Sequence, residues 1–307
     1  MKTKNIVGPL MLSLAAGIWG GMYVVVKVVV EYIPPVELVW ARYLVAIIAL
    51  GFLSLIKREK WRINKKDLWL IILIGIIGNA ISIVAQETGT WLSDAKTGAV
   101  ITSATPTFML IFAWWLLKEK LTKIKLTSVL LATIGVLSIV GIHFTGKNVI
   151  YGVISLIIAA LTWALMSVLI KQLSGNYSSL QITIMATIVA IIVLTPFAVT
   201  NPNNLAKIDL TNTIIVSSLL YLGVVSTAIA FVMWNYGLTL VSAGSSGLFF
   251  LLQPLVGTFL GWLFLNEDLS WGFLIGSILI LGSVWLTIRF DNATPTTDRK
   301  GPQANEL

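Results

Sequence analysis

Aromatic and polar residues that interrupt long apolar stretches are the residues of this sequence best suited to bind a solute. Trp19 and Tyr23 stand four residues apart, so on a helix they would share one face. Trp163 occupies the place equivalent to Trp19 in a second stretch, 144 residues later. An indole far from water needs a partner for its N–H group, which favours a binding pocket. We therefore interpret Trp19, Tyr23 and Trp163 as candidate solute contacts, with packing against a neighbouring helix as the alternative.

A third apolar stretch carries polar residues on one predicted helical face. Asn79, Ser82 and Gln86 follow an i, i+3, i+7 spacing. Lipid cannot hydrogen-bond such groups, so they must face other helices or a cavity. Hydrogen bonds between helices, worth about 0.6 kcal/mol on average, explain the pattern as well as a cavity does. Asn79, Gln86 and Trp234, which stands at the place equivalent to Gln86, are further candidate contacts.

Two prolines inside apolar stretches follow polar residues. Thr102 lies one turn before Pro106, and Gln253 directly precedes Pro254. A proline within a helix removes a backbone hydrogen bond and exposes a carbonyl one turn earlier. Thr102 and Gln253 are therefore candidate contacts, and Pro106 and Pro254 are candidate hinges. A static kink satisfied by nearby hydroxyl groups is the alternative.

Arg42 is a charge deep within the outer half of an apolar stretch. Such a charge costs at least about 2.5 kcal/mol, so a partner is expected, and Glu87, Glu31 and Glu37 are the nearby carboxylates. Arg42 and Glu87 are candidates for binding a charged solute or a coupling proton. A structural ion pair that seals the outer rim explains them equally well. The equivalent position in the second half is Ala186, so the shared scaffold does not require the charge.

Composition indicates that the solvent of this chain is lipid. Apolar residues make up 57% of the 307 residues and charged residues only 11%, against about a quarter in soluble domains. There is no cysteine and the single histidine is His143, so no metal site or other cofactor is expected. The net charge of +8 resides in short connectors between apolar stretches, where it sets membrane orientation. Nucleic acid is therefore not an expected partner.

The apolar stretches predict an all-α integral membrane protein with ten transmembrane helices. A helix needs about 20 residues to cross the hydrocarbon layer, and five such stretches occur in each half. Because five is an odd number, the second half must enter the membrane from the opposite side, which makes the repeats inverted. The predicted spans are 10–30, 36–56, 68–88, 97–117, 125–143, 150–171, 178–199, 213–236, 244–264 and 271–290.

Lysine and arginine residues orient the predicted helices. Sixteen of them fall in segments on the side of the N-terminus and three in the opposite loops, which places both termini in the cytoplasm. The three are Lys96, Lys147 and Lys207. On this basis the protein is expected in the plasma (inner) membrane as a multi-pass protein.

Two further carboxylates stand at equivalent positions on opposite membrane faces. Glu119 and Glu267 each precede a hydroxyl residue, Thr122 or Ser270, that could cap the following helix. We interpret both as structural. Without a converging acid–base pair, a Walker loop or a nucleophile elbow, an enzyme is not expected.

The two halves of the chain repeat each other. Val45-Ala-Ile-Ile48 returns as Val189-Ala-Ile-Ile192, and Pro106 and Glu119 return as Pro254 and Glu267. Together with Trp-Gly at 19–20, Pro-Pro at 34–35, Arg-Tyr at 42–43 and the two Pro-x12-Glu-x-Leu endings, this pattern resembles the EamA family of the drug/metabolite transporter superfamily. The resemblance covers nearly 280 residues. It implies a single-chain metabolite transporter, often an exporter, whose central cavity is formed by the first, third and fourth helices of each half.

These observations predict a secondary transporter that exports a small amphipathic metabolite, such as an amino acid, by alternating access through a central cavity. A flippase for a lipid or lipid carrier and a non-transporting membrane scaffold are the alternatives. Residues 1–145 and 146–290 would form the two repeats, and 291–307 a disordered cytoplasmic tail. Pairs of glycines four residues apart, such as Gly17 and Gly21, suit packing within a monomer better than dimerisation, which stays open.

Overall fold

The computed structural model describes residues 6–61, 63–93, 98, 101–140, 148–173, 176–200, 202–206, 208–265 and 271–290. The predicted tail at 291–307, the outer lysines Lys96, Lys147 and Lys207, and Glu267 with Ser270 lie outside these residues.

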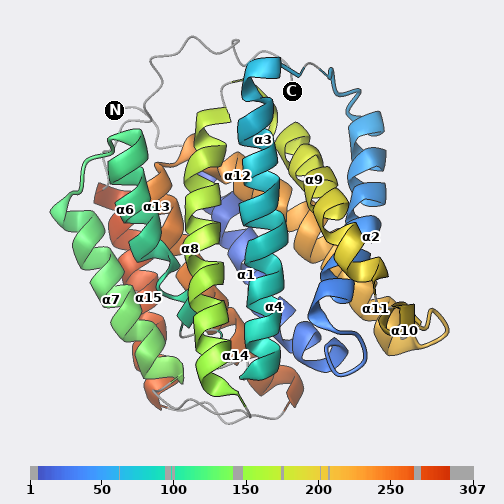
Figure 1. Cartoon of the computed structure of the whole chain (residues 1–307). Coiled ribbons are helices and arrows are strands. Elements are labelled where there is room, and N and C mark those ends of the chain that lie inside the picture. Colours follow the sequence, from blue (N-terminus) through green and yellow to red (C-terminus); the bar gives the residue numbers. More distant parts are fainter. Residues whose placement is uncertain are drawn as a thin grey trace.

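The described residues form a bundle of helices (Figure 1). Each of the ten predicted spans overlaps one helix or one contiguous helical run among them, and the fourth, predicted at 97–117, overlaps α6 from Thr105 onward. The first half contains α1 (Val7–Val29), α2 (Pro35–Ile56), a third run of η1 (Lys65–Asp67), α3 (Leu68–Ile74), η2 (Gly75–Ser82) and α4 (Ile83–Leu92), then α6 (Thr105–Leu117) and α7 (Lys123–Val140). The second half contains α8 (Val149–Leu173), α9 (Ser179–Val199), α10 (Pro202–Leu205), the run α11 (Thr213–Leu220), η3 (Tyr221–Ile229) and α12 (Ala230–Leu240), the run α13 (Ala243–Ser246), η4 (Gly247–Leu251) and α14 (Leu252–Leu265), and α15 (Trp271–Phe290).

The lengths and surfaces of these helices suit a bilayer. Seven of the described helical runs are long and apolar enough to cross a membrane, and two shorter apolar helices, Thr105–Leu117 and Ala243–Gly257, fall in the fourth and ninth predicted spans. Ile48 and its repeat counterpart Ile192 are 74% and 65% exposed, whereas Arg42 and Glu87 are fully buried. These apolar side chains thus face outward while the side chains of Arg42 and Glu87 lie inside, as lipid solvation favours.

Local sequence explains where several helices begin. Pro35 starts α2, where its missing N–H group costs no helical hydrogen bond. Ser178 and Gln181 form a reciprocal capping box at the start of α9. Pro106 and Pro254 also lie in the first turn of α6 and of α14, each after an irregular stretch of its span. The expected kink within a continuous helix is therefore corrected: each proline begins a new helical segment, a position that proline tolerates well.

Two π-helical segments, η2 and η3, occupy equivalent places in the two halves. A π-helix is rare, and where it occurs it often marks a functional site. In η3 the Thr227 hydroxyl donates to the carbonyl of Leu222, five residues earlier, over 2.7 Å. Nothing in the residue types predicted either segment, because both read as ordinary apolar helix.

The two halves exchange helix partners in an inverted manner. A Cβ added to Gly89 would lie 2.5 Å from the Leu156 side chain and 2.9 Å from the Gly152 carbonyl, and one added to Gly237 would meet the equivalent Leu12 and Gly8 at 2.5 and 3.2 Å. The first helix of each half, α1 or α8, therefore packs antiparallel against the third run of the other half. The pairs α2 with α9 and α7 with α15 pack at opposite edges of the bundle (Figure 1). This arrangement confirms the predicted inverted repeats.

Alanine at either close crossing is expected to destabilise the bundle. For Gly89→Ala and Gly237→Ala we expect a loss of about 1–3 kcal/mol, because the added methyl group forces the helices apart. Gly51, also within a helix, has open space around its Cβ position, and Gly51→Ala should instead change stability by less than about 1 kcal/mol. Unfolding of the purified variants in mild detergent measures the difference. Equal stability of Gly89→Ala and Gly51→Ala would show that the crossing tolerates a side chain.

Candidate functional site

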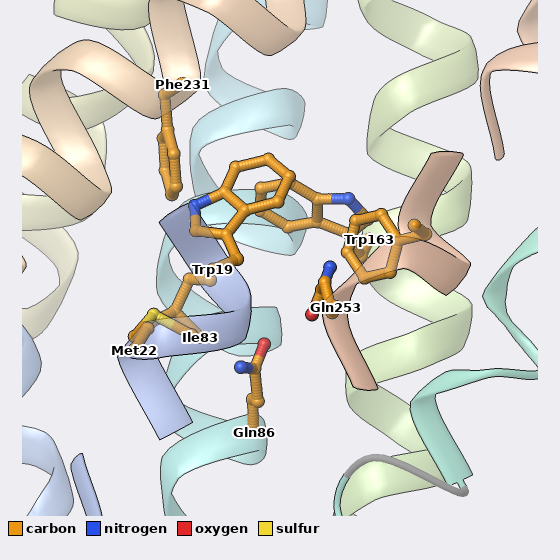
Figure 2. Close-up of a pocket in the computed structure, with 8 residues that line it drawn as sticks. Trp19, Met22, Ile83, Gln86, Trp163, Phe231 and Gln253 are labelled. Atoms are coloured by element: carbon orange, nitrogen blue, oxygen red, sulfur yellow. The ribbon is translucent and has the colours of Figure 1, made fainter. Parts of the chain in front are cut away.

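A cavity lies between the two halves and is lined by residues of both (Figure 2). Its walls come from α1 and α4 of the first half and from α8, α12, η4 and α14 of the second. Its empty volume is about 240 Å³, which includes space open to the surroundings. The free space inside it holds about one water molecule, so the cavity as it stands is too small for a metabolite. The lining residues are Trp19, Met22, Ile83, Gln86, Trp163, Phe231, Phe250 and Gln253.

Aromatic rings form one wall of the cavity. Trp19 and its repeat counterpart Trp163 meet edge to face, with ring centroids 5.2 Å apart and planes at 87°. Phe231 lies 5.8 Å from Trp19 and 5.3 Å from Trp163, and Phe250 lies 5.5 and 5.9 Å from the same two rings. Such contacts contribute about 0.5–1.5 kcal/mol each beyond burial. The two halves therefore meet at this cluster, which offers an apolar surface to a solute.

Polar side chains at the same cavity lack hydrogen-bond partners. Among the described residues, Trp163 Nε1 and Gln253 Nε2 are buried without a partner. By contrast, Trp19 Nε1 donates to the carbonyl of Ser226 over 2.9 Å. Buried polar groups are normally paired, so unpaired donors require an explanation. Both donors belong to residues that line the cavity, so they can serve a hydrogen-bond acceptor placed there.

The structure brings together half of the predicted solute contacts. Trp19, Gln86, Trp163 and Gln253 line the cavity. The others do not belong to its lining and have partners of their own, as follows. The hydroxyls of Tyr23 and Thr102 are hydrogen-bonded to each other at 3.1 Å. The Asn79 side chain donates through Nδ2 to the Thr187 hydroxyl over 3.5 Å, and Trp234 Nε1 donates to the Ser167 hydroxyl over 3.3 Å.

Three lining residues were not predicted as contacts: Met22, Ile83 and Phe231. Their apolar side chains look like ordinary bundle core in the sequence. One signal was available, because Met22 belongs to the repeated stretch that begins at Trp19 and returns as Met166.

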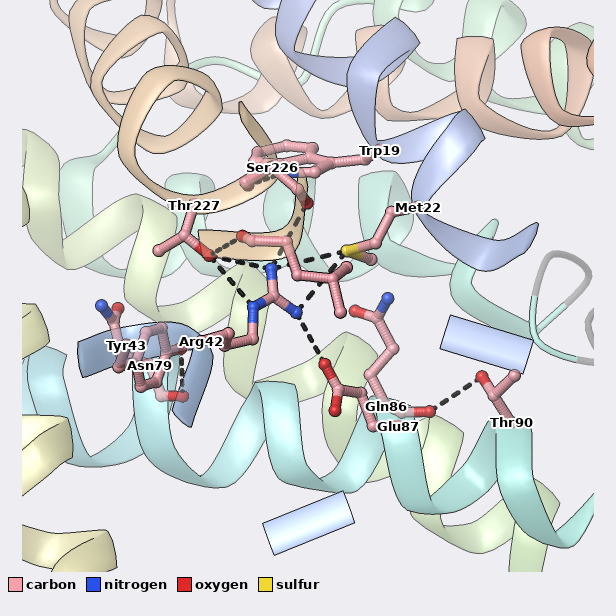
Figure 3. A network of polar contacts seen from close by, with 11 residues as sticks. Trp19, Met22, Arg42, Tyr43, Asn79, Gln86, Glu87, Thr90, Ser226 and Thr227 are labelled. Atoms are coloured by element: carbon pink, nitrogen blue, oxygen red, sulfur yellow. Dashed lines mark hydrogen bonds and ion pairs between the residues drawn. The ribbon is translucent and has the colours of Figure 1, made fainter. Parts of the chain in front are cut away.

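Arg42 and Glu87 form an ion pair inside the bundle (Figure 3). The Arg42 Nη1 and Glu87 Oε1 atoms are 2.6 Å apart, and both side chains are fully buried. Arg42 also donates to the Thr227 hydroxyl over 3.0 and 2.9 Å and to the Ser226 hydroxyl over 3.3 Å. Glu37, another partner that the sequence allowed, instead accepts from Asn204. Sequence reasoning missed Ser226 and Thr227 because they come from the π-helical segment of the other half.

Glu119 joins the two halves near the end of the bundle where α1 begins. Lys118 ends α6 in a left-handed conformation, and the Glu119 N–H bonds back to Ala113. The Glu119 carboxylate accepts from the backbone N–H groups of Ala243 and Gly244 over 2.7 and 3.1 Å, and Lys125 pairs with it at 3.2 Å. Its structural role is as predicted, but the helix that it caps belongs to the other half, not to the segment that follows it.

Comparison with known proteins shows what kind of protein contains this cavity. Residues 6–141 and 150–289 each match the EamA-like transporter family. The chain belongs to this family. It is therefore a multi-pass membrane transporter and not an enzyme, and its partners include a small-molecule solute and the bilayer.

Proteins named as transporters match along nearly the whole chain. The chain is 27% identical over 297 residues to "Uncharacterized transporter YetK" of Bacillus subtilis (strain 168), covering 94% of this chain and 90% of that protein. It is 27% identical over 286 residues to an "Uncharacterized transporter" of Archaeoglobus fulgidus, covering 91% and 98%. A solved crystal structure superposes with a TM-score of 0.75 at 15% identity, covering 92% of this chain and 98% of that one. This last likeness shows a shared fold.

Proposed function

We propose that this EamA-family protein is a secondary transporter that moves a small amphipathic metabolite, such as an amino acid, through the central cavity. The observation that carries the proposal is the pair of unpaired donors, Trp163 Nε1 and Gln253 Nε2, beside an aromatic wall. A carboxylate or carbonyl group of the solute would accept from both donors. Its apolar part would lie on the rings of Trp19, Phe231 and Phe250.

Alternating access supplies the movement in this proposal. The free space in the cavity holds about one water molecule, so a metabolite would fit only after the two halves move apart. Pro106 and Pro254 begin helical segments at equivalent places, which suits them as hinges. Release of Glu119 from the start of α13 would open the bundle at that end. Export, cytoplasmic termini and a location in the plasma membrane follow from the distribution of lysine and arginine and from the family resemblance, and belong to the same proposal.

Flux into proteoliposomes tests the proposal. The purified full chain is reconstituted and given a panel of labelled amino acids and related metabolites. We expect saturable flux of at least one solute that combines a hydrogen-bond acceptor with an apolar part. Trp163→Phe and Gln253→Ala each remove one donor, so each should raise the half-saturation concentration by up to about tenfold.

A matched control is available in Trp40, whose indole donates to Thr195 and does not line the cavity. Trp40→Phe should keep the half-saturation concentration of the unmodified chain. Unchanged saturation in both Trp163→Phe and Gln253→Ala would refute the pocket assignment. Passage of fluorescent phospholipid without flux of any solute would instead favour a flippase.

A further inference from the structure

The Glu87 carboxylate is held at one of its two oxygens. Oε1 accepts from Arg42 over 2.6 Å, whereas Oε2 is buried and has no hydrogen-bond partner among the described residues. A carboxylate can accept about four hydrogen bonds, and leaving an ionised oxygen unpaired away from water is costly. Glu87 Oε2 is therefore the atom of the ion pair at which a proton could bind.

The rest of the Arg42 guanidinium is well supplied with partners. It donates to Thr227 through two nitrogens and to Ser226 through one, and the Met22 sulfur lies 3.7 Å from both terminal nitrogens. Arg42 would thus keep most of its hydrogen bonds if Glu87 became neutral. Protonation of Glu87 at Oε2 would also leave Oε1 free to accept from Arg42.

The fold itself does not require this ion pair. Ala186 and Asn235 stand where the second half has its equivalents of Arg42 and Glu87. The same close helix crossing occurs in both halves: a Cβ on Gly75 would meet Val189 and the Ala186 carbonyl, and one on Gly223 would meet Val45 and the Arg42 carbonyl. One crossing therefore forms beside a charge and the other without it. Because intramembrane charge is expensive, its presence in one half points to a function.

The ion pair is continuous with the cavity (Figures 2 and 3). Met22 lines the cavity and contacts Arg42, and Gln86, which also lines it, directly precedes Glu87. Ser226 accepts from Trp19 through its carbonyl and from Arg42 through its hydroxyl. A change in the charge of Glu87 would therefore act on residues that form the cavity wall.

We propose that Glu87 binds and releases a proton at Oε2 in each transport cycle, with Arg42 as its counter-ion, so that solute movement is coupled to a proton. The proposal rests on the transport function proposed above. An O–H bond forms at Oε2 when water on the open side supplies the proton, and the same bond breaks when the proton leaves to water on the other side. Solute bound in the cavity and a proton on Glu87 would then cross within one cycle.

Few other groups could take over this proton. Among the described residues of the helices packed against α4, η2 carries no charged or titratable side chain. The groups on α1, α2 and α8 are Tyr23, Lys27, Glu37, Arg42, Tyr43, Tyr151 and Lys171. Of these, Arg42 is the one bonded to Glu87, while Tyr43 is hydrogen-bonded to Asn79, Tyr23 to Thr102 and Glu37 to Asn204.

Infrared difference spectroscopy tests proton binding without a known solute. The full chain is placed in lipid nanodiscs and its spectrum is compared between about pH 5 and about pH 9, a range that spans the titration of a perturbed carboxyl group. We expect a carbonyl band of a protonated carboxylic acid that Glu87→Gln removes and Arg42→Lys shifts. Glu37→Gln, which alters a buried carboxylate outside this pair, should leave the band in place. A band that Glu87→Gln leaves unchanged, or the absence of any such band, overturns the proposal.

A second arm uses proteoliposomes and a solute found in the panel. A gradient of one pH unit is expected to drive up to about tenfold accumulation per proton in the unmodified chain, and Glu87→Gln should lose this accumulation. Saturable flux that is indifferent to the gradient would overturn coupling while leaving the transport function intact. Absence of flux for every solute would contradict the transport function, and the infrared band would still decide whether Glu87 binds a proton.

Discussion

Replacing Arg42 by methionine is expected to lower the free energy of unfolding by about 3–5 kcal/mol, because it leaves Glu87 as a buried charge without a partner. Both side chains are fully buried, and the 2.6 Å contact is the sole hydrogen bond that the described residues provide to the Glu87 carboxylate. Methionine has a similar length, so loss of packing contributes less than loss of charge. The penalty should shrink at low pH, where Glu87 can take up a proton and become neutral.

The double variant Arg42→Met/Glu87→Gln separates charge from packing. It leaves the pair uncharged, like the equivalent residues Ala186 and Asn235 in the second half. The double variant should therefore recover most of the stability lost in the single variant. Equilibrium unfolding of both variants and of the unmodified chain in the same mixed micelles provides the comparison. A double variant as unstable as Arg42→Met would mean that the guanidinium is needed for its bonds to Ser226 and Thr227 and not to balance Glu87.

The architecture could be predicted from the sequence because it depends on the length and number of apolar stretches. A helix must cross a fixed thickness of hydrocarbon, so the ten stretches and their repeated residues were enough to derive the inverted arrangement. The glycines at the helix crossings also reflect the repeat, since Gly8 and Gly152 stand at equivalent positions and each packs against the third helical run of the other half.

The site was only partly predictable because it depends on contacts between distant segments. Trp19 and Trp163 were recognisable as buried indoles, and Arg42 with Glu87 as intramembrane charges. The Ser226 and Thr227 ligands of Arg42 arise from a π-helical segment, whose extra residue per turn leaves no mark on an apolar pattern. Phe231 could not be predicted as a lining residue, because an apolar side chain at a cavity has the same chemistry as one in the core.

Differences between the repeats were more informative than their similarities. Gln86 corresponds to Trp234. Gln86 lines the cavity, whereas Trp234 does not belong to the lining and packs against Trp19, with ring centroids 5.3 Å apart. Arg42 corresponds to Ala186, so of these two equivalent positions the first carries a buried charge and the second carries none. Residues shared by both halves, such as the crossing glycines, support the scaffold. The cavity combines both kinds of residue: Trp19 and Trp163 are repeat counterparts, whereas Gln86 is found in one half.

Passage of solute through this cavity can be tested by blocking it with a thiol reagent. The chain contains no cysteine, so a single introduced thiol has no background. Ile83 lines the cavity and takes part in none of the polar contacts there, which makes Ile83→Cys a suitable position. Thr211→Cys, on an exposed turn between α10 and α11, is the matched control. Both variants are reconstituted in proteoliposomes and allowed to cycle with solute before and during treatment.

The decisive measurement is solute flux after modification of Ile83→Cys, with the extent of modification read by mass spectrometry. We predict that modification stops flux, that saturating solute slows the modification, and that Thr211→Cys transports normally when modified. Fully modified Ile83→Cys with undiminished flux would contradict transport through the cavity between Trp19 and Trp163.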